Sequence, residues 1–257
     1  MIDAHCHLYD AADVAQQMYL YERGGVACVS EDLTSLERSL ALAEQWPGVI
    51  YVGGALHPAH SVTITPLELD KFFARLEEVH SRLDLVGESG LDYKYAVTPE
   101  QRQLQGSLLQ RHFDFAARHR LPVNLHSRRA ERAVVEAALE FRSTTGLNAL
   151  LHWFTSSRKL IRHGAAGGLF FSAGPVILED ENSFRAACSI PLELLLTETD
   201  APVPFTRGGG RLEAVKEVTE KLALYHEMSL SEFELVLRDN FRSYLADPAA
   251  DTPGAES

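Results

Sequence analysis

The amino-acid sequence predicts an α/β fold in which eight parallel strands, each followed by a helix, form a single-domain (β/α)8 (TIM) barrel. Short apolar runs of strand character alternate eight times with longer segments in which apolar residues recur at helical spacing. The chain has 257 residues, a length that such barrels commonly use as one domain. An open doubly wound sheet would show the same alternation and is the alternative fold.

Each predicted strand is a short run of mainly aliphatic and β-branched residues. In chain order the eight strands are Ile2–His5, Val26–Val29, Val49–Leu56, Leu85–Glu88, Val123–His126, Ala149–His152, Leu169–Ser172 and Leu194–Thr199. No linker rich in Pro, Gly or Ser divides the chain, so we place one domain over residues 1–245. The stretch Ala246–Ser257 has almost no apolar side chains, and we predict that it is a disordered tail.

Three of the predicted helices have clear start signals. Thr98-Pro-Glu-Gln101 and Thr65-Pro-Leu-Glu68 both combine a capping box with a proline at the first helical position. Ser231 and Glu234 have the spacing of a further capping box, and we predict that the last helix begins there and ends near Tyr244.

The composition excludes several classes of protein. Asp and Glu (36) outnumber Lys and Arg (24), so the formal net charge is −12 and no global basic field attracts nucleic acid. The cysteines, Cys6, Cys28 and Cys188, are too scattered for a disulfide framework or a zinc ribbon. No apolar run reaches the ~18 residues of a membrane span, and the first residues lack the basic start of a signal peptide. We therefore expect a reduced, cytoplasmic, globular protein that does not enter a membrane.

Side chains of the types that bind metal ions stand at the ends of otherwise apolar strands. The six residues are His5, His7, Glu88, His126, His152 and Asp200. Because the carboxyl ends of barrel strands all face one side, we expect these residues to converge on one site. Residues two apart point to the same side of a strand, so both imidazoles of the first pair can reach one cation. Four imidazoles and two carboxylates are enough for two divalent ions, with one carboxylate between them.

Other residues of these types are expected to have structural roles. Cys6 lies between two of the histidines but should point to the opposite side of the strand, as a small buried apolar residue. The histidines in or beside predicted helices are expected to be surface or packing residues: His80, His112, His119, His163 and His226.

Five short motifs follow one another along the predicted strand ends. They are His5-Cys-His7, Gly87-Glu-Ser-Gly-Leu-Asp92, Leu121-Pro-Val-Asn-Leu-His126 with Ser127-Arg128, His152-Trp-Phe154 and Thr199-Asp-Ala-Pro202. In order and spacing this set resembles the TatD family of metal-dependent deoxyribonucleases, in the amidohydrolase superfamily. The resemblance covers roughly Ile2 to Leu245.

The resemblance implies a role for each of these residues. In the family's arrangement the first metal would be bound by His5, His7 and Asp200, the second by His126 and His152, and both by Glu88. His57 and Arg128 match positions that the family places near substrate phosphate. Imidazole ligands suit Zn, Mn, Ni or Co, and carboxylates with phosphate leave room for Mg.

We therefore expect hydrolysis of a DNA phosphodiester bond, acting from strand ends, by a water that two divalent ions activate. Asp200 is expected to accept the proton of that water, Glu88 to bridge the ions, and Arg128 to neutralise charge on the phosphoryl oxygens. The same site would also suit another phosphate-bearing substrate. An ester, lactone, amide or aminoacyl-tRNA bond is the alternative substrate class, and a metal-bound interaction protein without turnover is a third interpretation.

Overall fold

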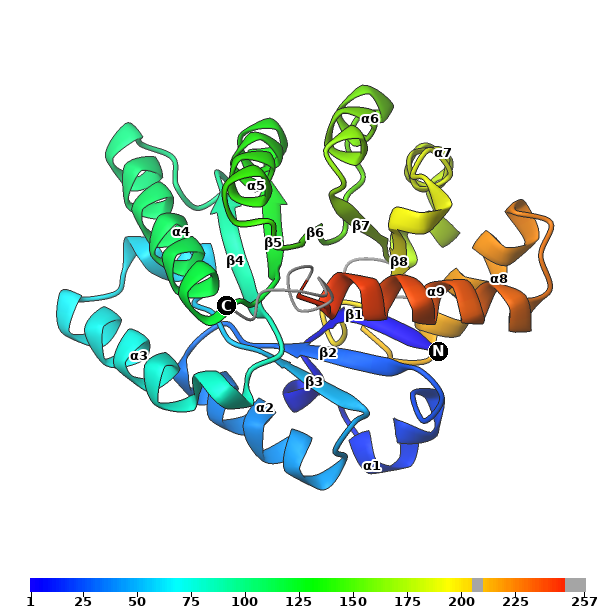
Figure 1. The fold of residues 1–257 in the computed structure, drawn as a ribbon, viewed down its shortest axis with the longest axis horizontal. Helices are drawn as coiled ribbons and strands as arrows, with labels where there is room; N and C mark the ends of the chain where they lie inside the picture. The colour runs from blue at the N-terminus through cyan, green and yellow to red at the C-terminus, as the bar shows by residue number, and fades with distance from the viewer. Residues whose placement is uncertain (205–209, 248–257) are drawn as a thin grey trace, which may run out of the picture.

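The computed structural model describes residues 1–204 and 210–247, in which strands alternate with helices as predicted (Figure 1). The strands are β1 (Ile2–Cys6), β2 (Gly25–Val29), β3 (Ile50–Gly53), β4 (Val86–Asp92), β5 (Val123–Arg128), β6 (Ala149–Leu151), β7 (Phe170–Ala173) and β8 (Leu195–Thr197). The α-helices in the described residues are α1 (Val14–Gln17), α2 (Leu33–Gln45), α3 (Pro66–Val79), α4 (Pro99–His119), α5 (Glu131–Thr145), α6 (Arg158–Ala166), α7 (Glu181–Ala187), α8 (Ala214–Tyr225) and α9 (Leu230–Leu245).

The strands pair in parallel throughout, and the helices lie around their outside (Figure 1). The backbone hydrogen bonds between neighbouring strands divide them into two sheets, β1-β2-β3 and β4-β5-β6-β7-β8. Hydrogen bonds cross both gaps between them. The Gly54 backbone N–H donates to the Leu85 carbonyl at 3.1 Å beside β3 and β4, and the Thr197 hydroxyl donates to the Ile2 carbonyl at 2.7 Å between β8 and β1. The predicted α/β barrel class is therefore confirmed, with its ladder interrupted at these two places.

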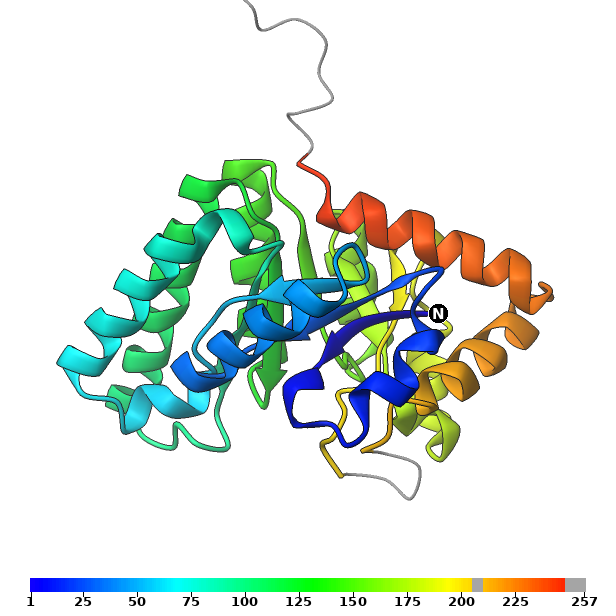
Figure 2. The same ribbon diagram turned by 90° about the horizontal axis from the view of Figure 1, so that it is seen from below.

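Helix α9 covers the amino-terminal ends of the strands. It lies across β1 and β8 in Figure 1 and beside α8 in Figure 2. The Asn240 side-chain amide donates to the carbonyls of Leu192 at 2.6 Å and Leu195 at 2.8 Å, where β8 begins. The opposite ends of the strands are consequently the ends at which barrel enzymes place their chemistry.

Both start signals that contain proline are confirmed. At the start of α4 the Gln101 N–H donates to the Thr98 hydroxyl at 3.3 Å, and the Thr98 N–H donates to the Gln101 side chain at 3.1 Å. Helix α3 begins with the same reciprocal pair, Thr65 and Glu68. Each box supplies acceptors for backbone donors that the first turn of a helix leaves without partners.

The predicted start of the last helix is wrong by two residues. Helix α9 follows Ser229, whose hydroxyl accepts the Glu232 N–H at 3.3 Å while the Glu232 carboxylate accepts the Ser229 N–H at 3.0 Å. Ser229 and Glu232 have the same spacing as Ser231 and Glu234, so the pattern fits both positions. Because the earlier box caps the helix first, Ser231 lies in its first turn.

Two strands differ from their predicted lengths in a way that matters for the site. Strand β4 continues past Glu88 to Asp92, because residues 89–92 keep pairing with β5. Gly90 permits this, since its φ is +143° and a Cβ there would lie 2.1 Å from the His126 carbonyl oxygen. Strand β8 ends at Thr197, so Asp200 lies in the following loop.

Only two residues of the predicted tail are described. The Arg120 guanidinium donates to the Asp247 carboxylate, with 2.9 Å between Arg120 Nε and Asp247 Oδ2, and residues 248–257 lie outside the described part. Cys6 is fully buried in an apolar cluster with Leu8 and Cys28, as predicted. Within residues 1–204 and 210–247, no helix combines the length and the apolar character needed to span a membrane.

Candidate metal centre

Glu88, on β4, lies at the centre of a cluster of polar side chains at the carboxyl ends of the strands. Its Oε2 atom is 3.5 Å from His5 Nε2 and 3.5 Å from His7 Nε2. The same two nitrogens lie 3.5 Å and 3.1 Å, respectively, from Asp200 Oδ1. Four side chains thus direct ligand-type atoms into one small volume, which we call the first group.

The other oxygen of Glu88 faces a second group. Its Oε1 atom is 2.7 Å from His126 Nδ1 and 2.9 Å from His152 Nε2. His57 Nε2 lies further away, at 3.6 Å. The six residues that the sequence singles out at strand ends are therefore brought together, and the two oxygens of Glu88 are divided between two groups of them.

Asp200 reaches the first group from a loop that β1 holds in place. Its backbone is left-handed, with φ of 52°, and its N–H donates to the His5 carbonyl at 3.0 Å. The preceding residue, Thr199, donates its N–H and its hydroxyl to the Asp3 carboxylate at 2.9 Å and 2.6 Å. Because Asp3 and His5 both belong to β1, this strand positions Asp200 as well as its own histidine.

Two buried atoms of the first group have no hydrogen-bond partner within the described part of the chain. They are His5 Nε2 and Asp200 Oδ1, which lie 3.5 Å apart. A buried polar atom without a partner costs free energy, and a cation bound by both atoms would remove that cost. Imidazole nitrogen and carboxylate oxygen are donors that divalent transition metals accept. The residues of the first group therefore fit a metal ion.

Hydrogen bonds on the outer side of the first two histidines determine which ring nitrogen carries the proton. The Asn124 amide nitrogen donates to the Ala4 carbonyl at 2.9 Å, so its oxygen faces His5 Nδ1, also at 2.9 Å. A neutral His5 can donate to that oxygen only from Nδ1, which leaves the lone pair on Nε2. His7 Nδ1 lies 3.0 Å from the Tyr9 hydroxyl, which donates its own proton to the Glu31 carboxylate, and 3.3 Å from the Val29 carbonyl. In their neutral forms, both rings consequently direct an unprotonated nitrogen toward Glu88.

The second group has carboxylates in the same outer positions. His126 Nε2 lies 3.1 Å from Asp92 Oδ2, and His152 Nδ1 lies 3.7 Å from Glu198 Oε1. Glu198 is fully buried, and its Oε2 accepts the Ser172 hydroxyl at 2.6 Å. For a neutral His126, the Asp92 oxygen favours a proton on Nε2 and a lone pair on Nδ1, which faces Glu88. His152 Nδ1 and Glu198 Oε1 are too far apart for a hydrogen bond, and neither atom has another partner within the described residues.

His57 differs from the other four histidines near Glu88. Its Nδ1 accepts the Ala59 backbone N–H at 3.1 Å, so a neutral ring carries its proton on Nε2, the atom nearest Glu88. Burial lowers the pKa of His57 to about 3, which keeps the ring neutral at pH 7. Ligand atoms of His57, Asp92 and His126 are close enough to hold an ion, but a protonated Nε2 has no lone pair for one. His57 is therefore a hydrogen-bond donor to the site.

The carboxylates draw protons onto the surrounding imidazoles when no cation is bound. Burial alone would lower the pKa of His7, but the nearby Asp200 carboxylate, 3.1 Å from His7 Nε2, and the charge of Glu88 outweigh it and raise the pKa to about 9. The pKa of His126 and the pKa of His152 are also raised by nearby carboxylates, against the effect of burial. Burial opposes ionisation of Glu88 and of Asp200, yet the imidazoles lower the pKa of both carboxyls. Bound divalent cations would replace these protons.

Arg128 lies outside the Glu88 cluster. It ends β5, and its backbone carbonyl accepts the Tyr93 N–H at 2.9 Å. Its side chain is exposed, and the guanidinium forms no hydrogen bond or ion pair with another residue in the described ranges. The nearby Glu131 carboxylate accepts the Arg129 backbone N–H at 3.1 Å instead. The Arg128 guanidinium is thus available to a ligand.

The histidines predicted to have structural roles also lie outside the cluster. His112 is buried, and its Nε2 accepts the Leu56 N–H at 3.1 Å. His119 pairs with Glu77 at 2.8 Å, and His163 pairs with Glu136 at 3.3 Å. His80 and His226 follow α3 and α8 directly.

Sequence reasoning missed the outer partners of the histidines. Asp92 and Asn124 stand inside two of the quoted motifs, and Glu198 stands two residues before Asp200. The signal that could have found them is a polar side chain within an apolar strand, two residues from a ligand candidate or at the strand's end. Such a residue needs a partner of its own when it is buried.

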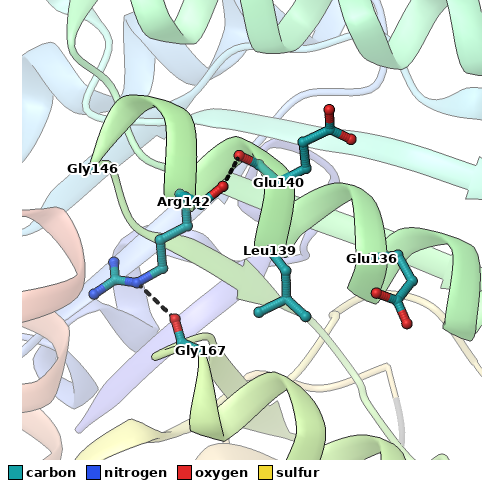
Figure 3. Close-up of a pocket in the computed structure, with 7 residues that line it drawn as sticks. Glu136, Leu139, Glu140, Arg142, Gly146 and Gly167 are labelled. Atoms are coloured by element: carbon teal, nitrogen blue, oxygen red, sulfur yellow. Dashed lines mark hydrogen bonds between the residues drawn. The ribbon is translucent and has the colours of Figure 1, made fainter.

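A groove on the described surface lies away from this cluster. It has a volume of about 770 Å³ and is lined by Glu136, Leu139, Glu140, Arg142, Ser143, Gly146 and Gly167 (Figure 3). Arg142 Nε donates to the Gly167 carbonyl across it at 3.0 Å. The two glycines follow the carboxyl ends of α5 and α6. In a barrel these helix ends lie opposite the carboxyl ends of the strands, so the groove is separate from the Glu88 cluster.

The sequence and the fold of this chain were compared with those of known proteins. The family model described as TatD related DNase matches residues 2–246. The human protein named deoxyribonuclease TATDN3 is 29% identical over 216 residues, which cover 79% of this chain and 78% of that protein. A Mycobacterium tuberculosis protein named uncharacterized metal-dependent hydrolase TatD is 31% identical over 217 residues, or 79% of this chain and 80% of that protein. The crystal structure of YjjV, a TatD homologue from Escherichia coli, has a TM-score of 0.79 at 25% identity and covers 95% of this chain and 97% of its own. These matches confirm the resemblance seen in the motifs: the chain belongs to the TatD-related DNase family.

Proposed function

We propose that the chain is a divalent-metal-dependent hydrolase that cleaves DNA phosphodiester bonds with two ions bound around Glu88. The observation that carries this proposal is the division of the two Glu88 oxygens, since Oε2 faces the first group and Oε1 the second. A carboxylate in this position can bind one ion with each oxygen. The other proposed ligands are His5, His7 and Asp200 for the first ion, and His126 and His152 for the second.

The donor set limits the identity of the ions. Four imidazoles favour Zn, Mn, Ni or Co, and the carboxylates with a substrate phosphate also allow Mg. When bound, such ions supply an activated water and stabilise negative charge on the phosphate.

Asp200 is the proposed acceptor of the proton released by the attacking water. Its Oδ1 has no hydrogen-bond partner in the described ranges, and its side chain is 14% exposed, whereas that of Glu88 is 4% exposed. Asp200 is thus the carboxylate of the first group that solvent reaches more readily, and its lowered pKa keeps it ionised and able to accept a proton.

His57 and Arg128 are the proposed contacts to substrate phosphate. His57 presents a neutral Nε2–H at the edge of the cluster, and Arg128 presents a guanidinium without a protein partner in the described ranges. A guanidinium offers a planar pair of donors that matches two phosphate oxygens. The net charge of −12 provides no basic surface for coating long DNA, so we propose that cleavage starts at strand ends.

The test of the substrate class compares DNA with neutral substrates. The protein, supplied with Zn, Mn, Mg, Ni or Co, is assayed on single-stranded DNA, an aminoacyl-tRNA and a lactone. Cleavage of DNA alone supports the proposal, and exclusive cleavage of the ester or lactone contradicts it in favour of attack at carbon. Absence of turnover on every substrate, with metal bound, would support the interaction-protein interpretation.

The Arg128→Lys variant tests how the phosphate is recognised. Lysine keeps the charge but loses the paired donors, so kcat/KM on DNA should fall about tenfold or more, the scale of a hydrogen bond to a charged group. Any hydrolysis of a neutral ester should be unaffected. Arg118→Lys is the matched control, because Arg118 lies in the last turn of α4 and pairs with Glu77 on the protein surface. Equal losses on DNA and on the ester would contradict the phosphate role of Arg128.

A further inference from the structure

Asp92 lies between a proposed metal ligand and the loop that follows β4. Its Oδ2 lies 3.1 Å from His126 Nε2, and its Oδ1 accepts the Lys94 N–H at 2.8 Å. Its backbone carbonyl accepts the N–H groups of Tyr95 at 3.2 Å and Ala96 at 3.0 Å. The carboxylate is fully buried, so its position is set by these contacts and by the strand.

Gln105, a fully buried residue of α4, fixes Asp92 further. Its Oε1 accepts the Asp92 N–H at 2.9 Å, and its Nε2 donates to the Asp92 carbonyl at 3.0 Å. The same Nε2 donates to the Pro58 carbonyl at 3.0 Å, beside His57. One amide therefore holds both the end of β4 and the loop that carries the His57 donor.

The two groups around Glu88 differ in where their negative charge lies. The first group has the Asp200 carboxylate in the cluster itself. The outer ring nitrogens of its histidines contact uncharged groups: the Asn124 amide beside His5, and the Tyr9 hydroxyl and Val29 carbonyl beside His7. Among the described residues, Glu88 is the carboxylate that lies between the two histidines of the second group, and the first group shares it. The outer neighbours of its histidines are carboxyl side chains instead, Asp92 beside His126 and Glu198 beside His152. Apart from the shared Glu88, the second group thus has its carboxyl groups behind its histidines and not among its proposed ligands.

We propose that Asp92 is a positioning residue for the second ion, acting through His126, and that the buried Glu198 carboxyl, 3.7 Å from His152 Nδ1, is the corresponding group behind His152. This inference rests on the proposed two-ion site. Asp92 accepts the Nε2 proton of His126, which leaves Nδ1 to bind the ion, and its charge increases the basicity of the ring. Without it, His126 would be free to adopt the tautomer that carries the proton on Nδ1, the atom proposed to bind the ion.

The test measures Zn²⁺ binding to metal-stripped full-length protein by competition with a chromophoric chelator. Asp92→Asn keeps the shape of the side chain and removes its charge. Its affinity for the second Zn²⁺ should fall by about 10–100-fold, the usual effect of such a partner, while the first affinity stays at the wild-type value. Glu198→Gln should act in the same direction. Asp84→Asn is the matched control, since Asp84 precedes β4 at its other end and accepts the Val52 N–H at 2.7 Å.

Each outcome decides between defined possibilities. If Asp92→Asn and Asp84→Asn have equal affinities for the second Zn²⁺, this inference is overturned and the two-ion proposal is unaffected. An equal loss at both sites also overturns it, because the effect would then be general. If the wild-type protein binds fewer than two Zn²⁺ ions, the proposed function itself fails.

A second measurement does not depend on the variants. With ¹⁵N-labelled histidine, NMR of the Zn²⁺-loaded protein should show the His126 proton on Nε2, hydrogen-bonded to Asp92. A proton on Nδ1 would overturn the positioning role even if the variants failed to fold.

Discussion

Removing the metal should make the stability of this protein fall as the pH rises from 6.5 to 9. The pKa of His7 in the folded chain is about 9, against an ordinary value of 6.5. A histidine with a raised pKa stabilises the fold fully below its unfolded value and loses that contribution as the pH rises through its folded value. The shift corresponds to at most about 3 kcal/mol of unfolding free energy. For a chain of this size that is a fall in Tm of roughly 6–12 °C.

The Asp200 and Glu88 carboxylates raise the pKa of His7 and thereby cause the fall in stability with pH. Bound cations, which take the place of the proton on His7, should remove this fall. Because protons and metal ions compete for the same imidazoles, the increase in Tm on adding Zn²⁺ should grow over the same pH range. His126 and His152 have raised pKa values as well and act in the same direction.

Thermal melts of chelator-treated protein at a series of pH values test this reasoning. The His7→Gln variant should show a smaller fall in Tm between pH 6.5 and 9 than the wild-type protein. His163→Gln, at an exposed histidine paired with Glu136, is the control and should keep the wild-type fall. A stripped protein whose Tm is constant over this range would refute the reasoning, and so would an identical fall in the His7 and His163 variants.

The remaining predictions concern the carboxylates at the site. Asp200→Asn should keep the fold but lower kcat on DNA by about 10² or more, the range for losing a proton acceptor that is also a ligand; normal turnover would remove Asp200 from that role, and His163→Ala should leave kcat unchanged. Glu88→Gln offers an oxygen to only one of the two groups, because an amide nitrogen does not bind the ion. Elemental analysis should then find one Zn per chain instead of two, and two in this variant would contradict the bridging role of Glu88.

The convergence of the proposed ligands could be predicted from the sequence because it depends only on periodicity and topology. His5 and His7 are two apart in the sequence, and Glu88, His126 and His152 each close an apolar run that predicts a strand. The carboxyl ends of parallel barrel strands lie on one face for any conformation of the connecting loops, so such residues are close together. The roles of these residues as ligands remain predictions.

The outer partners could not be predicted in the same way, because they depend on register and loop conformation. Asp92 meets His126 only because β4 continues through Gly90, past the predicted end of the strand. Asn124 precedes His126 on the same strand, yet its side chain bonds to His5 on β1. The start of α9 was misplaced for a simpler reason, since two Ser-x-x-Glu patterns overlap there and spacing alone does not choose between them.

The gap in the ladder between β8 and β1 is linked to the assembly of the first group. Strand β8 ends at Thr197, and the next backbone donors do not continue a ladder. The Thr199 N–H bonds to the Asp3 side chain and the Asp200 N–H to the His5 carbonyl, while the His7 N–H donates to the Ala201 carbonyl at 2.8 Å. These bonds turn the chain so that Asp200 faces the two histidines of β1. A regular strand through this segment would alternate its side chains along a straight path, and the left-handed backbone at Asp200 would be lost. The interruption of the sheet is therefore the condition under which a carboxylate and two imidazoles meet at one point.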